Sequence, residues 1–583
     1  MMHFQAGIVH EGYKAYWGEN HWLEQDINEF CSAQEIRMTC ARQDFAAAQV
    51  CIYPKEGGTL TIGGAAAFSP HGARGGLRLD VQMDGFAPFM QHIGYMADDL
   101  GVERADILLA DETVELQAGR AQMVWLEIPV PADAKPGEYS GTVRIYEHFM
   151  FGAETPAAEL HFTVCVKDVL LPEKPTFYLD LWQHNSNIAR KHEVPLWSNA
   201  HFAIMERYVA TLGELGQRAV TVIASEIPWS GQNAYLTVNY ISDMYEYSMI
   251  RVTRGADGAF SYDYSIMQRY IDLCAKYGIA DEIEVFGLCN IWVTEEMGFG
   301  ACSDYPDGIR VRYLDESDGC YKFMDNKADI CGYIRALHDY FVSTGQIKRV
   351  RVVADEPADV VKHRERIDLL KANGPQFQYK TAVNHIEFIE EFQDDILDLA
   401  PVLPFAAKEI ETLQNVRSKK GGRVTWYVCC SPKFPNTFLA SPLCESRLIG
   451  LLTWYLQLDG FLRWNYTVWP ERPREQISYR SGIWSAGDTN FVYPSYGGDV
   501  LLTLRYKILK RGIGDYELAR MADLSPEDAL WDSILKEKQI VKFYDEDWIG
   551  NPDRDSGNPA RCYVRDYAAY DALKEALLEK IEK

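Results

Sequence analysis

The sequence has no hydrophobic run long enough to cross a membrane. Every apolar stretch in its 583 residues is interrupted by charge, glycine or proline before it reaches the ~20 residues that a spanning helix needs. The N-terminus also lacks a basic segment leading into an apolar stretch with a small-residue cleavage site, which is the pattern of a secretory signal. We therefore expect a soluble protein without membrane insertion and with a cytoplasmic location.

Basic charge is scarce relative to acidic charge. The chain has 58 Lys and Arg against 84 Asp and Glu, which gives a formal net charge of -26 at pH 7. Such a surface repels nucleic acids and anionic lipids. We expect neither as a partner.

Motifs for metals, phosphates and nucleophilic serines are also missing. The 13 cysteines are an odd number without paired-ligand spacing, and a reducing cytoplasm disfavours a disulfide framework. The adjacent Cys429 and Cys430 have no second pair and no helical His-x-x-x-His arrangement to complete a metal site. No glycine-rich phosphate loop and no serine nucleophile elbow is present, which argues against kinases and esterases. We expect no metal and no cofactor.

Aromatic residues, in contrast, are abundant. They make up 13% of the chain, with 14 Trp and 34 Tyr. Flat apolar rings suit the faces of sugars, and they equally suit a large aromatic core. Composition alone leaves both interpretations open.

The first part of the chain has the pattern of β-strands. Apolar residues occupy every second position in three stretches separated by Pro/Gly turns. These residues are Val124, Leu126, Ile128 and Val130, then Val143 and Ile145, then Leu160, Phe162, Val164 and Val166. The spacing predicts an antiparallel β-sandwich over residues 1–173, and the prolines within residues 170–175 indicate a linker.

After the linker, short apolar segments alternate with amphipathic helical patterns. Such alternation is typical of parallel strands joined by crossover helices, and eight strands are the number of a closed barrel. The eight segments are 177–181, 219–223, 283–288, 350–353, 379–383, 402–405, 424–428 and 460–464. We therefore predict an α/β fold with an all-β accessory domain: a (β/α)8 TIM-like barrel over 174–515, followed by a helical segment over 516–583 that closes on it.

Active sites of such barrels form at the carboxyl ends of the strands. The fourth predicted strand, 350–353, is followed almost directly by Asp355 and Glu356. Two carboxyl groups at a barrel mouth can divide acid and base roles, because repulsion and burial raise the pKa of one of them. Such a division suits glycoside hydrolysis. The competing interpretation is a solvated turn or a charge pair at a helix N-terminus.

Other predicted strands end in aromatic and amide side chains, which can stack on sugar rings and bond their hydroxyls. Packing explains any single tryptophan equally well. The argument therefore rests on the placement of several aromatic and amide side chains at strand ends. His184 and His385 suit either proton transfer or substrate contact, and neither is assigned a role. The candidates for substrate binding are Trp182, Gln183, Trp229, Gln232, Asn384, Tyr427, Trp464 and Trp469.

Several motifs together resemble glycoside hydrolase family 123, whose known members are β-N-acetylgalactosaminidases. They are Ala354-Asp355-Glu356-Pro357, Trp426-Tyr427-Val428-Cys429-Cys430 with Pro435-Asn436, Asp459-Gly460-Phe461-Leu462-Arg463-Trp464-Asn465, Ala486-Gly487-Asp488, Tyr493-Pro494, Leu504-Arg505 and Arg511-Gly512-Ile513-Gly514-Asp515-Tyr516-Glu517. The resemblance covers most of the chain. It implies a β-sandwich before the barrel, in agreement with the strand pattern.

The resemblance also implies a substrate-assisted retaining mechanism, an exception to the two-carboxylate scheme. The 2-acetamido oxygen of the sugar would attack its own anomeric carbon. Glu356 would be the general acid/base, and Asp355 would hold the acetamide nitrogen and balance the oxazolinium charge. Tyr427 would bond the acetamide oxygen, and Trp464 would form the floor of the sugar subsite. Arg447, Arg505 and Asp515 also match the family pattern, but a structural role in ion pairs that lock the barrel explains these charged residues better.

The expected activity is exo-acting release of terminal β-linked N-acetylgalactosamine from glycans such as glycosphingolipid oligosaccharides. One alternative is a β-N-acetylglucosaminidase, because the sequence alone does not decide the configuration at C4. Another is a glycosidase that uses one of these acids with a distant carboxylate such as Asp488. A non-catalytic carbohydrate-binding protein is the third. We expect a monomer or a homodimer.

Overall fold

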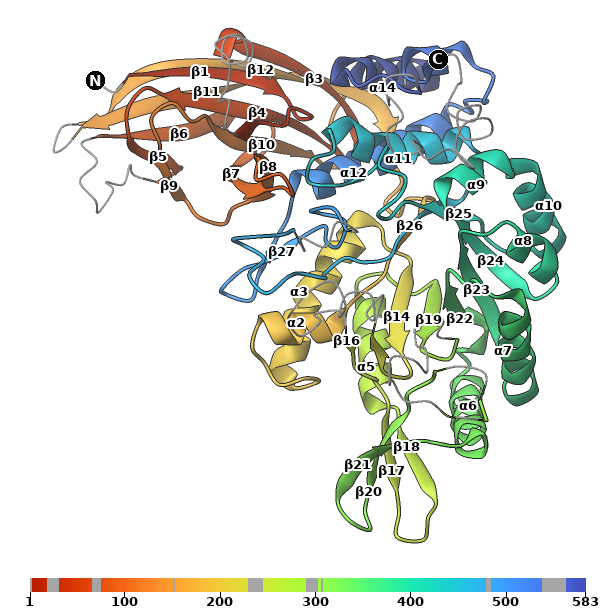
Figure 1. Ribbon diagram of the computed structural model, residues 1–583. Helices are drawn as coiled ribbons and strands as arrows, with labels where there is room; N and C mark the ends of the chain where they lie inside the picture. The colour runs from red at the N-terminus through yellow and green to blue at the C-terminus, as the bar shows by residue number, and fades with distance from the viewer. Residues whose placement is uncertain are drawn as a thin grey trace.

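We analysed a computed structural model of the chain, shown in Figure 1. It describes residues 3–17, 31–64, 75–149, 153–228, 245–289, 302, 304–305, 308–478, 484–536 and 562–583. An all-β part lies on one side, with the C-terminal helix beside it, and a part of mixed helices and strands lies below (Figure 1). No helix among these residues is long and apolar enough to span a bilayer.

The all-β part consists of two six-stranded sheets. In spatial order the first contains β1 (Phe4–His10), β4 (Asp44–Pro54), β10 (Gln122–Val130), β7 (Phe89–Ala97), β8 (Glu103–Leu108) and β2 (Tyr16–Trp17). The second contains β3 (Glu35–Arg42), β12 (Thr155–Leu170), β11 (Gly137–Phe149), β6 (Gly75–Met83), β5 (Gly58–Ile62) and β9 (Thr113–Leu116). Most neighbours are antiparallel, but β3–β12 and β5–β6 are parallel, which differs from the purely antiparallel prediction.

The alternation in the sequence correctly identified the face that each strand buries. The apolar residues predicted to share a face in β10, β11 and β12 all belong to one buried cluster drawn from both sheets. The intervening Met123 and Trp125 of β10 are buried as well, in the larger core that continues into the rest of the molecule. Strand β10 is therefore buried on both faces, and one of them packs on the α/β part.

Among its described residues, the α/β part contains eight strands that pair with one another only in parallel. They are β13 (Tyr178–Leu181), β14 (Ala219–Ile223), β19 (Glu282–Phe286), β22 (Val350–Asp355), β23 (Gln378–Val383), β24 (Ile396–Pro401), β25 (Thr425–Tyr427) and β26 (Gly460–Arg463). They form one sheet of order β14-β19-β22-β23-β24 and another of order β13-β26-β25. Isolated parallel bridges link the sheets at both sides. Leu179 pairs with Gln217 on one side, and Leu399 with Val424 and Val402 with Tyr427 on the other.

The predicted sixth strand is wrong. Residues 402–405 lie at the start of helix α9 (Leu403–Lys408), and the strand is β24, just before it. Pro404 fits the first turn of a helix, where its missing N–H is not needed. The true strand was overlooked because it contains Asp398, a charged residue whose carboxylate is buried against Arg351. The other seven predicted segments overlap observed strands.

Helices follow most of these strands and cover the sheets. They are α2 (Asn185–Lys191), α3 (Asn199–Leu215), α5 (Ser265–Lys276), α6 (Lys327–Ser343), α7 (Val360–Asn373), α8 (Glu387–Phe392), α10 (Ile410–Lys420), α11 (Leu443–Tyr455), α12 (Leu504–Met521) and α14 (Tyr567–Glu582), with short 3-10 turns at Ile347–Arg349 and Ala529–Ser533. Helices α11 and α12 touch closely, because a Cβ on Gly450 would lie 1.8 Å from the Gly512 carbonyl oxygen. Helix α12 runs across the predicted boundary at residue 515.

Smaller strands were not predicted. A four-stranded sheet of order β18-β17-β20-β21 projects at the far end of the molecule from the all-β part (Figure 1). Its strands are β17 (Arg251–Arg254), β18 (Phe260–Asp263), β20 (Arg312–Asp315) and β21 (Cys320–Phe323). Two-stranded ribbons pair β15 (Ile227–Pro228) with β16 (Tyr245–Glu246), and β27 (Tyr493–Pro494) with β28 (Val500–Leu501).

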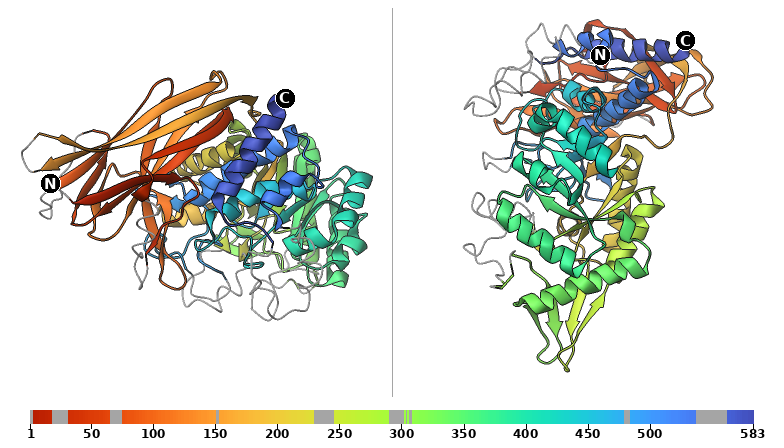
Figure 2. Two further views of the ribbon diagram at one scale, coloured as in Figure 1. Left: turned by 90° about the horizontal axis from the view of Figure 1, so that it is seen from above. Right: turned by 90° about the vertical axis from the view of Figure 1, so that its right-hand side faces the viewer.

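Buried ion pairs join the all-β part to helix α12. Arg505 bonds Asp106 of β8 at 2.9 Å, and Arg511 bonds both Glu11 and Asp44, at 2.7 and 2.8 Å. In the left view of Figure 2 the blue C-terminal helices lie between the orange sheets and the green part. The expectation that Arg505 forms an ion pair is confirmed.

A second group of charges is buried among the parallel strands. The Lys380 Nζ of β23 lies 2.5 Å from Asp180 of β13, and 2.7 and 3.1 Å from Glu284 and Glu282 of β19. These three strands are not neighbours in the sheets, so the contacts between their side chains show that these residues face one another. The cluster therefore identifies which residues of each strand point inward.

Replacing Lys380 by methionine should destabilise the protein by about 3–5 kcal/mol, because buried carboxylates lose their counter-charge. The midpoint of urea unfolding measures the loss. Lys276→Met removes an exposed lysine that pairs with Glu206, and it serves as the matched control with an unchanged midpoint. Equal midpoints for the two variants would contradict the role given to the buried cluster.

Candidate active site

The two predicted catalytic acids lie at the carboxyl end of β22. Val353 pairs with Lys380, so Val353 and Asp355 share the inward face of the strand. Glu356 then adopts a left-handed φ of 46°, which is rare for a residue with a side chain. Its N–H still donates to the Ala382 carbonyl at 2.9 Å. The left-handed turn interrupts the alternation of the strand, so adjacency does not send the two carboxyls to opposite faces.

Glu356 is bound to Tyr427 on a different strand. The Tyr427 hydroxyl donates to Glu356 Oε1. Tyr427 pairs with Leu462 and Leu462 pairs with Asp180, which places Tyr427 on the inward face as well. The hydrogen bond therefore crosses between the ends of β22 and β25, and it brings together two residues predicted to be functional.

Burial disfavours the charged forms of both Glu356 and Tyr427. Burial raises the pKa of Glu356, while the Tyr427 hydrogen bond and the nearby His385 act in the opposite direction. Burial and the negative charge of Glu356 raise the pKa of Tyr427 well above its ordinary value. Tyr427 therefore remains a hydrogen-bond donor, and Glu356 can hold a proton at a higher pH than an exposed glutamate.

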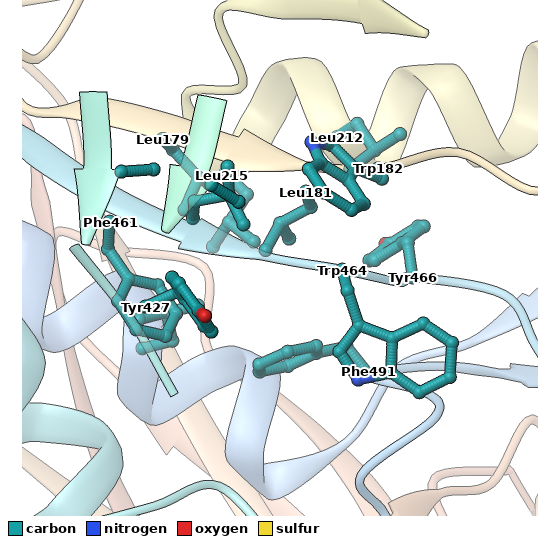
Figure 3. Close-up of a cluster of buried hydrophobic side chains, with 14 of the residues drawn as sticks. Leu179, Leu181, Trp182, Leu212, Leu215, Tyr427, Phe461, Trp464, Tyr466 and Phe491 are labelled. Atoms are coloured by element: carbon teal, nitrogen blue, oxygen red, sulfur yellow. The ribbon is translucent and has the colours of Figure 1, made fainter. Parts of the chain in front are cut away.

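Trp464 follows strand β26 and lies in the same buried cluster as Tyr427 and Trp182 (Figure 3). Its Nε1 donates to Asp488 Oδ1 at 3.2 Å, and the Arg463 Nη2 donates to the same oxygen at 2.8 Å. Burial raises the pKa of Asp488 to about 6, against the lowering effect of Arg463. The candidate platform for a sugar is thus held by a buried ion pair.

Three other predicted binding residues are placed deep in the fold. Trp182 is buried, with its ring edge-on to Phe286 at 4.9 Å between centroids. The Gln183 Oε1 accepts from the Thr221 N–H at 2.8 Å, and the Trp469 Nε1 donates to the Val492 carbonyl at 2.7 Å. The side-chain groups of Gln183 and Trp469 thus serve internal hydrogen bonds, and no sugar contact follows from their placement.

The remaining predicted contacts follow β23 or lie outside the described residues. Asn384 is half-buried, and its Oδ1 has no hydrogen-bond partner within the described part of the chain, so an acceptor is available directly after β23. His385 is exposed, and its Nδ1 lies 3.7 Å from Glu387. Trp229 and Gln232 lie outside the described residues.

Histidine 184 is not exposed at the site. It is fully buried, and burial lowers its pKa to about 4. Its Nδ1 lies 3.9 Å from Glu246, whose own pKa burial raises to about 7. Sequence reasoning missed Glu246, because it lies in the short ribbon strand β16 without an apolar pattern around it. The arrangement suits a structural role for His184 beneath Trp464, whose carbonyl it contacts at 2.9 Å.

The adjacent cysteines lie beyond Tyr427. Their sulfur atoms are 3.8 Å apart, and both thiols are free. The hydrogen bond with Cys430 and burial both raise the pKa of Cys429 well above its ordinary value. Within the described ranges, no cluster of three or more His, Cys, Asp or Glu is arranged to hold a metal ion.

Comparison with known proteins identifies the family of the chain. The catalytic-domain model of glycoside hydrolase family 123 matches residues 182–522. A family 123 glycoside hydrolase from Clostridium perfringens, studied for glycolipid glycan hydrolysis, is similar in structure, with a TM-score of 0.73, 18% identity, and coverage of 100% of this chain and 97% of that one. No curated protein matches the sequence.

Two other solved structures have much lower structural similarity to this chain. A putative glycoside hydrolase from Bacteroides vulgatus has a TM-score of 0.25 and 11% identity, over 67% of this chain and 64% of that one. A β-D-glucuronidase from Dictyoglomus thermophilum has a TM-score of 0.29 and 9% identity, over 81% and 68%. The family match spans more than half of the chain and includes both acids, Tyr427 and Trp464. This chain therefore belongs to glycoside hydrolase family 123, and it is a glycosidase.

Proposed function

We propose that this glycosidase releases terminal β-linked N-acetylgalactosamine from glycans such as glycosphingolipid oligosaccharides, with retention of configuration. The observation that carries the proposal is the Glu356–Tyr427 hydrogen bond, with Asp355 next to it at the end of β22. The similar enzyme from Clostridium perfringens, which is described as hydrolysing glycolipid glycans, supports the substrate class.

In the proposed first step, the acetamide oxygen of the substrate attacks the anomeric carbon. Glu356 donates its proton to the leaving glycosidic oxygen, and the aglycone departs as an alcohol. Asp355 accepts a hydrogen bond from the acetamide N–H and balances the positive charge of the oxazolinium ion. The raised pKa of Glu356 supports this role, because the residue must be protonated before cleavage.

In the second step, the ionised Glu356 takes a proton from water as the water attacks the anomeric carbon. The bond to the acetamide oxygen breaks, and the sugar leaves with its original configuration. Tyr427 would turn its hydroxyl from Glu356 to the acetamide oxygen when substrate binds. Adjacent carboxyls suit this chemistry because the acetamide and the leaving oxygen are neighbouring groups on one sugar.

The proposed framework for this chemistry is a closed (β/α)8 barrel over residues 174–515. The isolated parallel bridges at both sides of the two parallel sheets support closure, since each links an edge of one sheet to an edge of the other. Both acids then lie at the carboxyl ends of the strands, as expected for such barrels. We further propose a sandwich domain over 1–173 and a closing helical segment over 516–583.

The burial of Asp488 disfavours the main alternative mechanism. A two-carboxylate glycosidase would need Asp488 or another distant acid to face the anomeric carbon or a water. Asp488 is fully buried, and Arg463 and Trp464 both donate to its Oδ1. A distinction between galacto and gluco substrates, in contrast, depends on the groups that meet the C4 hydroxyl.

Glu356→Gln and Asp355→Asn should each lower kcat/KM on an aryl β-N-acetylgalactosaminide by at least ~100-fold, since each removes a group that acts in the transition state. Steady-state kinetics on this substrate, its gluco epimer and the 2-hydroxy galactoside measure the effect. The wild type should cleave only the acetamido sugars. Glu387→Gln, an exposed acid near the site, should retain full activity.

Two results would refute the proposal. Equal cleavage of the 2-hydroxy galactoside would show that the acetamide is not the nucleophile. Full activity of both acid variants would place the catalytic groups elsewhere.

Tyr427→Phe should shift the falling alkaline limb of the kcat/KM profile to higher pH. The Tyr427 hydrogen bond stabilises the charged form of Glu356 and lowers its pKa, so its loss raises that pKa and the acid stays protonated longer. The pH dependence of kcat/KM reports the free enzyme. Tyr379→Phe is the control, because within the described residues the buried Tyr379 hydroxyl has no hydrogen-bond partner. A limb that stays in place or moves to lower pH contradicts the assignment.

A further inference from the structure

Asp488 is a buried charge whose position calls for an explanation. It is fully buried, although burying a carboxylate is costly unless hydrogen bonds and an opposite charge compensate. Its Oδ1 takes two donors, from Arg463 and Trp464, while its Oδ2 has no hydrogen-bond partner in the part of the chain that the structure describes. All the side-chain hydrogen bonds that the described residues donate to this carboxylate therefore meet one oxygen, which ties Asp488 to Arg463 and Trp464.

The donors to Asp488 come from three consecutive residues at the end of β26. Besides the two bonds to Oδ1, the Asp488 carbonyl oxygen accepts from the Arg463 Nη2 at 3.1 Å and from the Asn465 Nδ2 at 2.7 Å. Side chains of consecutive residues in a strand diverge, so their convergence on one residue clamps the strand end. The indole of Trp464 is thereby fixed at its Nε1, which sets the direction that the ring faces.

The same ion pair reaches the segment that follows Tyr427. The Arg463 Nη1 donates to Asn436 Oδ1 at 3.0 Å and contacts the Val428 carbonyl oxygen at 3.4 Å. The Asn436 Nδ2 in turn donates to the carbonyl oxygens of Cys429 and Pro432, at 2.9 and 2.7 Å. One buried network therefore holds the supports of both Trp464 and Tyr427.

We infer that Asp488 is a positioning residue that holds the Trp464 ring in the orientation that one sugar ring requires. The inference rests on the proposed function, in which Trp464 is the floor of the sugar subsite. A buried Asp488 touches no substrate and acts through the ring. Loss of such positioning typically costs about 10- to 100-fold in rate, because groups must be held in the reactive geometry.

The test is a double-mutant cycle of Asp488→Asn and Trp464→Phe, with kcat and KM measured separately on the aryl N-acetylgalactosaminide. Asp488→Asn should lower kcat/KM by about 10- to 100-fold in the wild-type background. It should have a much smaller effect in the Trp464→Phe background, because the ring through which it acts has lost its N–H. Additive losses, or wild-type kinetics for Asp488→Asn, would overturn the inference.

A second readout does not depend on activity. In protein labelled with fluorotryptophan, Trp464→Phe identifies the ¹⁹F signal of Trp464. Asp488→Asn should shift or broaden that signal, whereas Asp515→Asn should leave it unchanged. Asp515 of helix α12 is the matched control, because it is also buried and paired with an arginine. Its carboxylate lies 2.6 Å from the Arg447 guanidinium. An unchanged Trp464 signal in Asp488→Asn contradicts the inference.

The two readouts separate failure of the inference from failure of the proposed function. A wild type that cleaves no acetamido sugar refutes the function, and the ¹⁹F signal then still decides whether Asp488 orients the ring. A wild type that is active, with additive losses in the cycle, refutes the inference alone. Asp515→Asn should keep wild-type kcat and KM even if its melting temperature falls, which separates positioning from general destabilisation.

Discussion

The hydrogen bond from Tyr427 to Glu356 is the interaction on which the site depends. It joins the end of β22 to the end of β25, and Tyr427 lies on the same face of the strands as Asp355. The left-handed backbone at Glu356 makes this possible, since an extended residue there would point its carboxyl away from Asp355. Strain of this kind is often found at functional sites, where the surrounding structure holds it in place.

Buried ion pairs support the strands and helices around the site in three places. Lys380 and its three acids lie among the parallel strands, the Arg463–Asp488 pair lies beside Trp464, and Arg505 and Arg511 tie helix α12 to the all-β part. Isolated charges would be unfavourable in such surroundings, and paired charges with specific geometry favour one arrangement over its alternatives. Directional contacts between buried charges therefore contribute to the organisation of the molecule beside its apolar core.

Much of this could be predicted from residue patterns. Alternation identified β10, β11 and β12, and short apolar runs identified seven of the eight parallel strands, because burial on defined faces leaves a periodic signal. Strand β24 escaped because Asp398 interrupts its apolar pattern, and residues 402–405 were apolar but helical. Asp355 is the last residue of β22 and Glu356 directly follows it, which agrees with the predicted place of both acids at a strand end.

The finer geometry of the site could not be predicted in this way. Residue type does not reveal whether a side chain at a strand end faces a substrate or another strand, so Gln183 and Trp469 gave the same signal as Trp464.

The most direct test of the proposed mechanism is a crystal structure with a galacto-configured thiazoline, a stable mimic of the oxazolinium ion. The account predicts its ring on Trp464, its thiazoline nitrogen at Asp355 and its sulfur near Tyr427; a ligand bound away from Asp355 and Glu356 would contradict it.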